Sequence, residues 1–538
     1  MNRPLKVIVV GSGVAGMAFA HRLSSLMGIG EVDIRMFSKG APETSNSHAA
    51  QGGVAAVIDP SDSWEQHRDD TLEVGAGRNA PEVVERVVKE GPACIQELLT
   101  KGARFDLDAE GRLDAAREGG HSAARVVHRG DRTGAELVRV LRGQVKGDPK
   151  ITVTETLIAL DLLVTEAPDG RLCSGVRTID VHTGVVREQY ADVTVLATGG
   201  AGQVYRHTTN PVGATGSGVA MALRANVTLR DMAFVQFHPT ALYAPDQEGT
   251  FLISEAVRGA GAVLLRPDGS RLMEGLHPMA DLAPRNVVAR AIHAVMRDQH
   301  APHVWLDATR IGEARFAREF PMILDHCWSI GLDPNKEPIP VMPAAHYLCG
   351  GIRTDGQGRS DLEGLYALGE CAGSGLHGAD RLASNSLLEA LVIPRHAAAS
   401  IMITEWQKPI AEDEETGRYV FTEPSPMTLA TLDELRDRMM DSVGIVRDDA
   451  GLQAASDALV GLSSQADAAW STGERSMELL ELRDLVLVGQ AICKQAMAEP
   501  VNAGAHWNRD RQAPGSKGSG VSDPSGPHRP ERHHKALT

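Results

Sequence analysis

Cysteine, positive charge and long apolar runs are scarce in this sequence, and each shortage excludes a class of protein. The 538 residues include six cysteines and no CxxC pair, which excludes the common zinc and iron–sulfur spacings and predicts reduced, structural thiols. Lysine and arginine number 54 against 70 acidic residues, and the net charge of −16 argues against binding to a nucleic-acid backbone. No run of 18 apolar residues occurs, so no membrane span is expected.

The N-terminal segment also lacks the features of a signal peptide. MNRPLKVIVVGSG enters a strand-like run directly, without a longer apolar stretch or a small-residue cleavage site, and a cytoplasmic protein is therefore expected. The length predicts two or three domains. Glycine, by contrast, is abundant at 55 residues, which indicates many tight turns or a backbone that passes close to a ligand.

The first glycine cluster lies between a predicted strand over residues 5–10 and a predicted helix over residues 17–26. A second predicted strand covers residues 32–37, a β-α-β pattern typical of dinucleotide binding. The glycines allow a tight turn and a close approach of the backbone to a pyrophosphate. The N-terminus of the following helix favours the negative charge of that group. The alternative is a glycine-rich turn with a purely structural role. The predicted cofactor contacts here are Gly11, Ser12, Gly13, Val14, Ala15 and Gly16.

The end of the second strand has no acidic residue to hold a ribose, which disfavours a plain NAD dehydrogenase. Ser38 and Lys39 stand there instead, and they are suited to a ribose hydroxyl and a phosphate. A loop of small and polar residues follows, in which backbone amides are able to approach a flat ring system. This loop comprises Asn46, Ser47, His48, Ala49, Ala50, Gln51, Gly52 and Gly53.

Two more strand-like runs end in glycine much later in the chain, at residues 193–200 and 364–370. Three such strands, far apart in sequence, are expected to form one sheet interrupted by an inserted domain at about residues 236–345. Beyond residue 425, leucines recur at helical spacing, which predicts a small helical bundle. From Arg511 onward, Pro, Gly and Ser supply 12 of 28 residues, and the tail is predicted to be disordered.

Seven motifs occur in an order typical of one flavoprotein family: GSGVAG, SHAAQGG, ATGGAG, FHPT, RGAG, PAAHYLCGG and ASNSLLEALV. Together they resemble the succinate dehydrogenase, fumarate reductase and L-aspartate oxidase flavoproteins over residues 5–400, with a weaker likeness in the C-terminal helices. The resemblance implies an α/β fold with a Rossmann-like FAD-binding domain, an inserted α+β capping domain and a C-terminal helical bundle. The expected boundaries are 1–235 with 346–424, 236–345, 425–510 and a tail over 511–538.

The resemblance also implies FAD as the cofactor, with Ser12 to Ala15 at its pyrophosphate. Relatives that attach FAD covalently use a histidine at the position of Asn46; His48 lies two residues too late, so non-covalent FAD is expected. Glu370 corresponds to the acid that binds the ribityl chain, and Ser386 and Leu387 to backbone donors at the flavin edge. The remaining predicted cofactor residues are Ala197, Gly199, Gly200 and Ser217.

A dicarboxylate substrate needs cationic or hydrogen-bonding clamps and a route for a proton. Considered alone, each histidine in these motifs is more simply explained as a hydrogen-bonded structural residue, and each arginine as a surface charge. By resemblance, Arg285 is the proton-shuttling arginine and Glu255 and Arg258 complete the proton path. The residues that resemble the dicarboxylate-binding set are His238, Ser254, His346 and Arg381.

Glu118, in the segment REGGHS, separates the subfamilies. In L-aspartate oxidases the matching acid resembles the group that receives the substrate ammonium, whereas succinate would leave such a buried carboxylate unpaired. The alternative is an exposed glutamate before a Gly-Gly turn.

The resemblance therefore implies FAD-dependent oxidation of L-aspartate to iminoaspartate, in which oxygen (giving hydrogen peroxide) or fumarate is the electron acceptor. This is the first step of de novo NAD biosynthesis, with possible functional coupling to quinolinate synthase. The alternatives are a soluble fumarate reductase or succinate-oxidising flavoprotein, and a flavin-binding scaffold without catalysis. The last is prompted by departures from the family pattern at Ser217, Ala233 and Ala260, and Asn286 is a further departure beside the proton-shuttling arginine.

Overall fold

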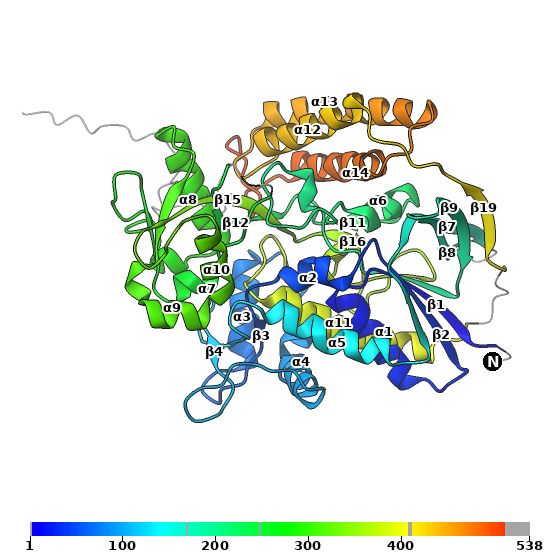
Figure 1. The fold of residues 1–538 in the computed structure, drawn as a ribbon, viewed down its shortest axis with the longest axis horizontal. Coiled ribbons are helices and arrows are strands. Elements are labelled where there is room, and N and C mark those ends of the chain that lie inside the picture. The colour runs from blue at the N-terminus through cyan, green and yellow to red at the C-terminus, as the bar shows by residue number, and fades with distance from the viewer. Residues whose placement is uncertain (1–2, 168–169, 246, 248, 407–410, 512–538) are drawn as a thin grey trace, which may run out of the picture.

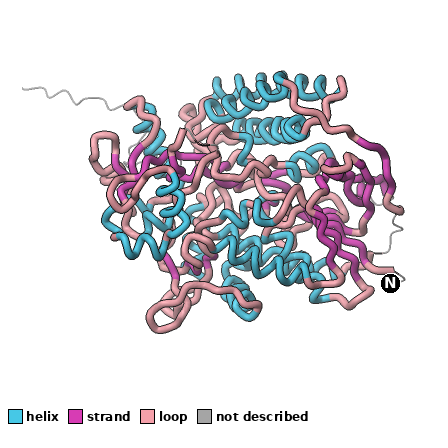
Figure 2. Tube along the Cα trace, viewed as in Figure 1, coloured by secondary structure: helices cyan, strands magenta, loops and turns pink. Residues whose placement is uncertain are grey.

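A computed structural model describes residues 3–167, 170–245, 247, 249–406 and 411–511 of the chain. Apart from Arg511, the tail predicted over residues 511–538 lies outside the described residues. The fold is mixed α/β with a C-terminal helical region, as the sequence predicts (Figures 1 and 2).

A five-stranded parallel sheet is the framework of the central domain, the part of the chain on either side of the inserted region, with the strand order β17-β10-β1-β2-β6. Branched residues favour the extended backbone of β1, and its side chains alternate between two hydrophobic cores. Val7 and Val9 pack against helices, whereas Ile8 and Val10 join the core on the other face. The strands are β1 Leu5–Val10, β2 Val32–Phe37, β6 Ile151–Thr154, β10 Val193–Leu196 and β17 Leu365–Ala367.

Four helices belong to the core on one side of this sheet: α1 Val14–Leu26, α4 Pro81–Thr100, α5 Thr133–Lys146 and α11 Asn385–Ile403. Among the described residues, α11 alone is long and apolar enough to cross a membrane by length and composition. It is a core helix here, with 67 % of that apolar window buried, and it packs along α1 and α4.

A four-stranded antiparallel sheet contributes to the core on the other face, in the order β19-β9-β8-β7. The strands are β7 Leu157–Ala167, β8 Gly170–Asp180, β9 Val185–Tyr190 and β19 Glu414–Arg418. Two three-stranded sheets complete this region, with strands β3 Val54–Ala55, β4 Ala115–Ala116, β5 Val126–Val127, β11 Leu229–Arg230, β16 Gly351–Arg353 and β18 Ala372–Gly373. The remaining helices of this region are α2 Asn46–Ala49, α3 Trp64–Val74 and α6 Ser217–Arg224.

The inserted region, green in Figure 1, has its own antiparallel sheet in the order β12-β15-β14-β13 and its own hydrophobic core. Its strands are β12 Val235–Leu242, β13 Val263–Leu265, β14 Val304–Asp307 and β15 Ile339–Leu348. Its helices are α7 Glu255–Gly259, α8 Arg285–Asp298, α9 Glu313–Glu319 and α10 Pro321–Ser329.

The paired strands β12 and β15 continue from this inserted region into the core of the central domain. Val235 and Leu348 belong to the central core, whereas Leu242 and Ile339 belong to the core of the inserted region. The expected limits at residues 236 and 345 thus fall inside continuous strands, and the domain division stays a prediction.

Three long helices follow: α12 Pro426–Ser442, α13 Asp449–Ser471 and α14 Met477–Ala498. Each begins with a side chain that accepts a hydrogen bond from a backbone N–H of the first turn, namely Ser425, Asp448 and Ser476. Their apolar faces pack into the central core, and they lie along the top of the molecule in Figure 1. The six cysteines are all buried and free.

Candidate active site

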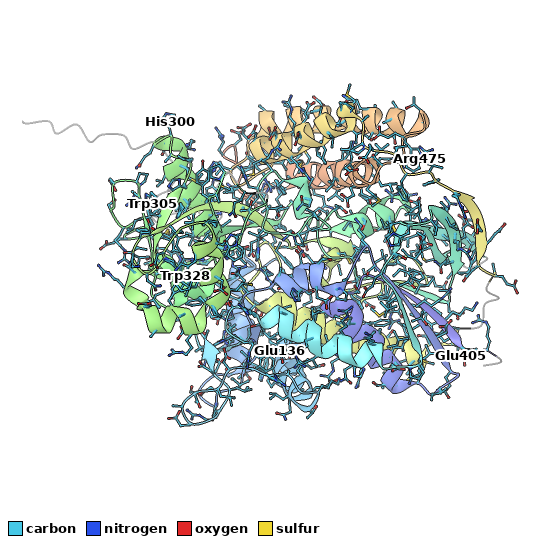
Figure 3. The ribbon with its side chains drawn as sticks, in the orientation of Figure 1. Glu136, His300, Trp305, Trp328, Glu405 and Arg475 are labelled. Atoms are coloured by element: carbon cyan, nitrogen blue, oxygen red, sulfur yellow. The ribbon has the colours of Figure 1, made fainter. Side chains whose placement is uncertain are left out.

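One continuous cavity extends from the glycine turn after β1 to the inserted region. All predicted cofactor residues line it except Val14, Gly16 and His48. The predicted substrate residues also line it, except Arg258. Side chains labelled in Figure 3, such as Trp328, lie near the periphery and do not line the cavity.

The glycine turn is shaped by contacts that leave no room for a side chain. Gly11 has a φ of +115°, and a Cβ there would lie 2.1 Å from the carbonyl oxygen of Ala197. A Cβ on Gly16 would lie 2.2 Å from the carbonyl oxygen of Gly11, so Gly16 packs the helix onto the turn rather than facing the cavity. The Val14 N–H at the start of α1 donates to Ser47 Oγ over 3.1 Å, which joins the turn to the loop of small residues.

Glu370 presents a half-buried carboxyl group to the same cavity. Its Oε1 accepts the Leu348 N–H over 3.0 Å, and its Oε2 accepts from Asn46 Nδ2 over 3.3 Å. Burial raises the pKa of Glu370 to about 7. Gly200 is required beside it, because a Cβ at that position would lie 2.2 Å from Glu370 Oε1.

The geometry of this half of the cavity suits FAD. The turn at the N-terminus of α1 suits a pyrophosphate, and Glu370 is an acceptor for hydroxyl groups. Gln51 donates through Nε2 to the carbonyl oxygen of Leu252 over 2.7 Å, while its buried Oε1 has no protein partner and remains available to a ligand. Lys39, expected at a phosphate, donates to Thr215 Oγ1 over 2.6 Å.

The substrate half of the cavity contains two carboxylates in opposite electrostatic environments. Glu255 accepts from Arg285 Nε over 2.6 Å and from Arg258 Nη2 over 3.0 Å. Although burial opposes its ionisation, the charges of Arg285 and Arg258 lower the pKa of Glu255 to about 2. Arg258 lies behind Glu255 and also donates to the carbonyl oxygen of Asp281, which explains why it does not reach the cavity.

Glu118 is the second carboxylate, and it has no ion-pair partner among the residues that the structure describes. It is 2 % exposed, and its Oε2 accepts from Ser384 Oγ over 2.6 Å. Burial raises the pKa of Glu118, and the nearby charge of Glu255 raises it further. A Cβ on Gly119 would lie 2.1 Å from Glu255 Oε1, so this glycine lets the loop that carries Glu118 approach Glu255.

Gln236, which sequence reasoning did not select, connects the two arginines of the cavity. Its Oε1 accepts from Arg285 Nη1 over 2.9 Å and from Arg381 Nη2 over 3.2 Å. Its Nε2 donates to Asp380 Oδ1 over 2.6 Å, and Asn286 Nδ2 donates to the other oxygen of Asp380 over 2.5 Å. A neutral amide thus holds two guanidinium groups side by side.

Arg381 lies over the ring of Tyr347, with 4.3 Å between the guanidinium carbon and the ring centroid. Its Nη1 donates to Ser386 Oγ. The Tyr347 hydroxyl lies 3.1 Å from His377 Nε2 and 3.2 Å from Glu389 Oε2, so a buried polar network fixes the ring. The pKa of Arg381 is lowered by burial and by the charge of Arg285.

His238 and His346 lie together, with 5.0 Å between their ring centroids. Burial and the neighbouring arginine charges lower the pKa of both far below 6.5, so both rings are neutral near pH 7. The Thr240 N–H donates to His238 Nδ1 over 3.2 Å, so Nε2 carries the proton and is a donor. Ser254 Oγ accepts the Ala256 N–H over 3.3 Å, which leaves its own proton for a ligand.

This half of the cavity therefore offers donors to two carboxylates and one buried carboxylate to a cation. Sequence reasoning missed five supporting residues, four of which lie within two positions of a residue that it selected. The feature that could have identified them is a polar side chain close in sequence to residues already selected. They are Thr209, Gln236, Tyr347, Asp380 and Ser384.

Comparisons with known proteins agree with this geometry. Residues 6–387 match the FAD binding domain family, and residues 432–518 match the fumarate reductase flavoprotein C-terminal family. An L-aspartate oxidase of Ralstonia nicotianae is 43 % identical over 513 residues, which cover 94 % of this chain and 95 % of the relative. The L-aspartate oxidase of Streptomyces coelicolor is 42 % identical, covering 94 % and 88 %.

The E. coli quinol fumarate reductase is similar in structure, with a TM-score of 0.84 and 29 % identity, covering 95 % of this chain and 92 % of that one. A glycine turn, a cavity suited to FAD and full-length relatives lead to one assignment. The chain belongs to the L-aspartate oxidase family of FAD-binding flavoproteins.

Proposed function

We propose that this protein oxidises L-aspartate to iminoaspartate with FAD as its cofactor, the first step of de novo NAD biosynthesis. Oxygen, giving hydrogen peroxide, or fumarate accepts the electrons. The observation that carries the proposal is the buried Glu118 carboxylate, which has no cationic partner in the described chain although two arginines line the same cavity. An amino-dicarboxylate supplies the missing cation.

The substrate carboxylates are bound by two pairs of donors. Arg381 with His346 holds one, and His238 with Ser254 holds the other. The neutral state of both histidines supports this role, because each ring keeps one N–H for a carboxylate without requiring protonation. Glu118 pairs with the ammonium group, and the unpaired carboxylate left by succinate disfavours that substrate.

FAD supplies the two-electron oxidation at the Cα–H bond of the substrate, and its predicted non-covalent attachment rests on Asn46 in place of a histidine. Arg285 and Glu255 of the proposed proton path both line the cavity, and Arg258 lies behind them. Because Glu255 is held ionised between two guanidinium groups, it forms an ion pair with Arg285 and orients its Nε.

Two further features of the proposal rest on the sequence and the family resemblance. We place the protein in the cytoplasm, because six cysteines without a CxxC pair suit a reducing compartment. We also propose functional coupling to quinolinate synthase, which consumes iminoaspartate in the family's pathway.

The test is anaerobic mixing of the purified yellow protein with L-aspartate or with succinate, followed by admission of air and a peroxide assay. L-Aspartate is expected to bleach the flavin absorbance, and air to restore it with formation of peroxide. Bleaching by succinate and not by L-aspartate would replace the proposal with a succinate-oxidising flavoprotein. A yellow protein that neither compound bleaches would indicate a non-catalytic scaffold.

The variant Glu118→Gln tests the observation that carries the proposal. Loss of the charged hydrogen bond is expected to lower kcat/KM for L-aspartate by about 100-fold. Fumarate reduction, which involves no ammonium group, should change by less than about threefold. The exposed Glu110→Gln serves as the matched control. An unchanged preference for L-aspartate in Glu118→Gln would remove this residue from the mechanism.

A further inference from the structure

Ser384 occupies an unusual backbone conformation at the wall of the cavity. It immediately precedes α11, with φ +62° and ψ +4°, in the left-handed region that residues other than glycine seldom adopt. The Ala55 N–H donates to its carbonyl oxygen over 3.1 Å. A strained serine held by the neighbouring strand indicates that the direction of its side chain matters.

The hydrogen bonds of Ser384 define which way its hydroxyl proton points. The Gly53 N–H donates to Ser384 Oγ over 3.2 Å, so the hydroxyl is already an acceptor on that side. Its own proton is free for Glu118 Oε2, 2.6 Å away. Ser384 therefore joins the loop expected around the flavin to the carboxylate expected at the substrate ammonium.

A second contact fixes the same two segments relative to each other. His121 Nε2 lies 2.9 Å from the carbonyl oxygen of Ala383, and Arg125 Nη1 lies 3.1 Å from His121 Nδ1. Because a guanidinium can only donate, Nδ1 is the acceptor and Nε2–H is the donor to Ala383. The loop that carries Glu118 and the turn that carries Ser384 are thus bound together at two points.

We propose that Ser384 is a positioning residue for substrate specificity, because its hydroxyl keeps the Glu118 carboxylate ionised and oriented toward the substrate ammonium. This inference rests on the proposed function of Glu118. A protonated Glu118 would leave the ammonium without a counter-charge, and the preference for an amino-dicarboxylate over succinate or fumarate would be lost.

The surroundings of Glu118 show why a donor is needed. Burial and the charge of Glu255 on α7 both raise the pKa of Glu118, and Ser384 opposes them with a hydrogen bond. Arg285 on α8 and Arg381 before α11 also lower it, but through space. His128 after β5 also interacts electrostatically with Glu118. Within the described chain, Ser384 is the side chain that donates a hydrogen bond to this carboxylate.

Removing the hydroxyl should therefore raise the pKa of Glu118 further and move the acidic limb of the L-aspartate pH profile upward. Two variants separate the effect of the hydroxyl from the effect of the backbone strain. Ser384→Ala removes the hydroxyl and keeps the strain, while Ser384→Gly removes both. Ser400→Ala, a buried serine on the same helix and outside the cavity, is the matched control.

Both Ser384 variants should lower kcat/KM for L-aspartate about tenfold or more on the acidic limb, mainly through KM, with partial recovery at high pH. Fumarate reduction should change by less than about threefold, and FAD content should match that of Ser400→Ala. Equal losses with L-aspartate and fumarate at every pH would overturn the inference, because they indicate a general structural defect.

The variant Glu118→Gln makes the two proposals separable. If it loses the preference for L-aspartate while both Ser384 variants retain the wild-type pH profile, the role of Ser384 is wrong and that of Glu118 stands. If Glu118→Gln keeps the preference, the proposed function of Glu118 fails, and the inference about Ser384 fails with it.

Discussion

The carboxyl group of Glu370 should make the FAD-free protein less stable as the pH rises. Burial raises its pKa from the usual 4.5 to about 7, so the folded chain holds this proton more tightly than the unfolded chain. The associated stability is fully present below 4.5 and is lost as the pH rises through about 7. At 1.36 kcal/mol per pH unit, the shift corresponds to about 3 kcal/mol.

The variant Glu370→Gln removes this titration while keeping a neutral side chain of similar shape. We expect urea unfolding of the FAD-free wild type to lose about 3 kcal/mol between about pH 4.5 and pH 8 from this group, and the variant to lack that component. Above about pH 7 the variant should be the more stable protein. The exposed Glu110→Gln is the control. Parallel stability curves for wild type and Glu370→Gln would refute the reasoning.

Three other substitutions test further contacts. Gly11→Ala should yield protein without bound FAD, because its Cβ would lie 2.1 Å from the Ala197 oxygen; a normal ratio of flavin to protein absorbance would contradict this. Arg285→Lys should lower kcat by about 100-fold or more at unchanged FAD content, since an ammonium cannot reproduce the guanidinium fork; stopped-flow reduction measures it. Asn286→Asp restores the family acid but places it 2.5 Å from the buried Asp380. Thermal unfolding should show that this variant is less stable than the wild type by about 1–3 kcal/mol at neutral pH and recovers in acid. Equal melting temperatures of variant and wild type at neutral pH would contradict this prediction.

The local elements of the central domain could be predicted because their signals lie within short segments. The branched residues of β1, the glycine turn and the apolar side of α1 are adjacent in sequence, and they specify a strand, a turn and a helix without reference to the rest of the chain. The order of the strands could not be predicted in this way. β10 pairs with β1 and β17 pairs with β10, and both follow β1 by more than 180 residues in the chain.

The limits of the inserted region are a second feature that the sequence alone does not define. A break was expected at residues 236 and 345, yet β12 and β15 pass through both positions. Both strands are buried along nearly their whole length, so their sequences give no sign of which core each end enters. Helical spacing likewise does not determine burial: Leu429 in α12 matches the spacing, but its side chain is 44 % exposed.

The substrate residues could be selected only through the family motifs, because their partners come from distant segments. Glu118 and Ser384 are 266 residues apart, and Gln236 and Arg381 are 145 apart. No local pattern distinguishes Gln236 from any other polar residue on a strand. Its importance appears only when three elements bring two arginines to one amide oxygen.

Within the described residues, the buried guanidinium of Arg381 donates its hydrogen bonds to neutral groups alone, and this has a consequence for measurements on the protein. In the described chain it contacts an amide, a hydroxyl and an aromatic ring, and no carboxylate lies within ion-pair distance. A desolvated cation without a counter-ion attracts small anions from the medium. Carboxylate buffers and salts will therefore compete with the substrate and raise the melting temperature, so the choice of buffer sets both the apparent KM and the apparent stability.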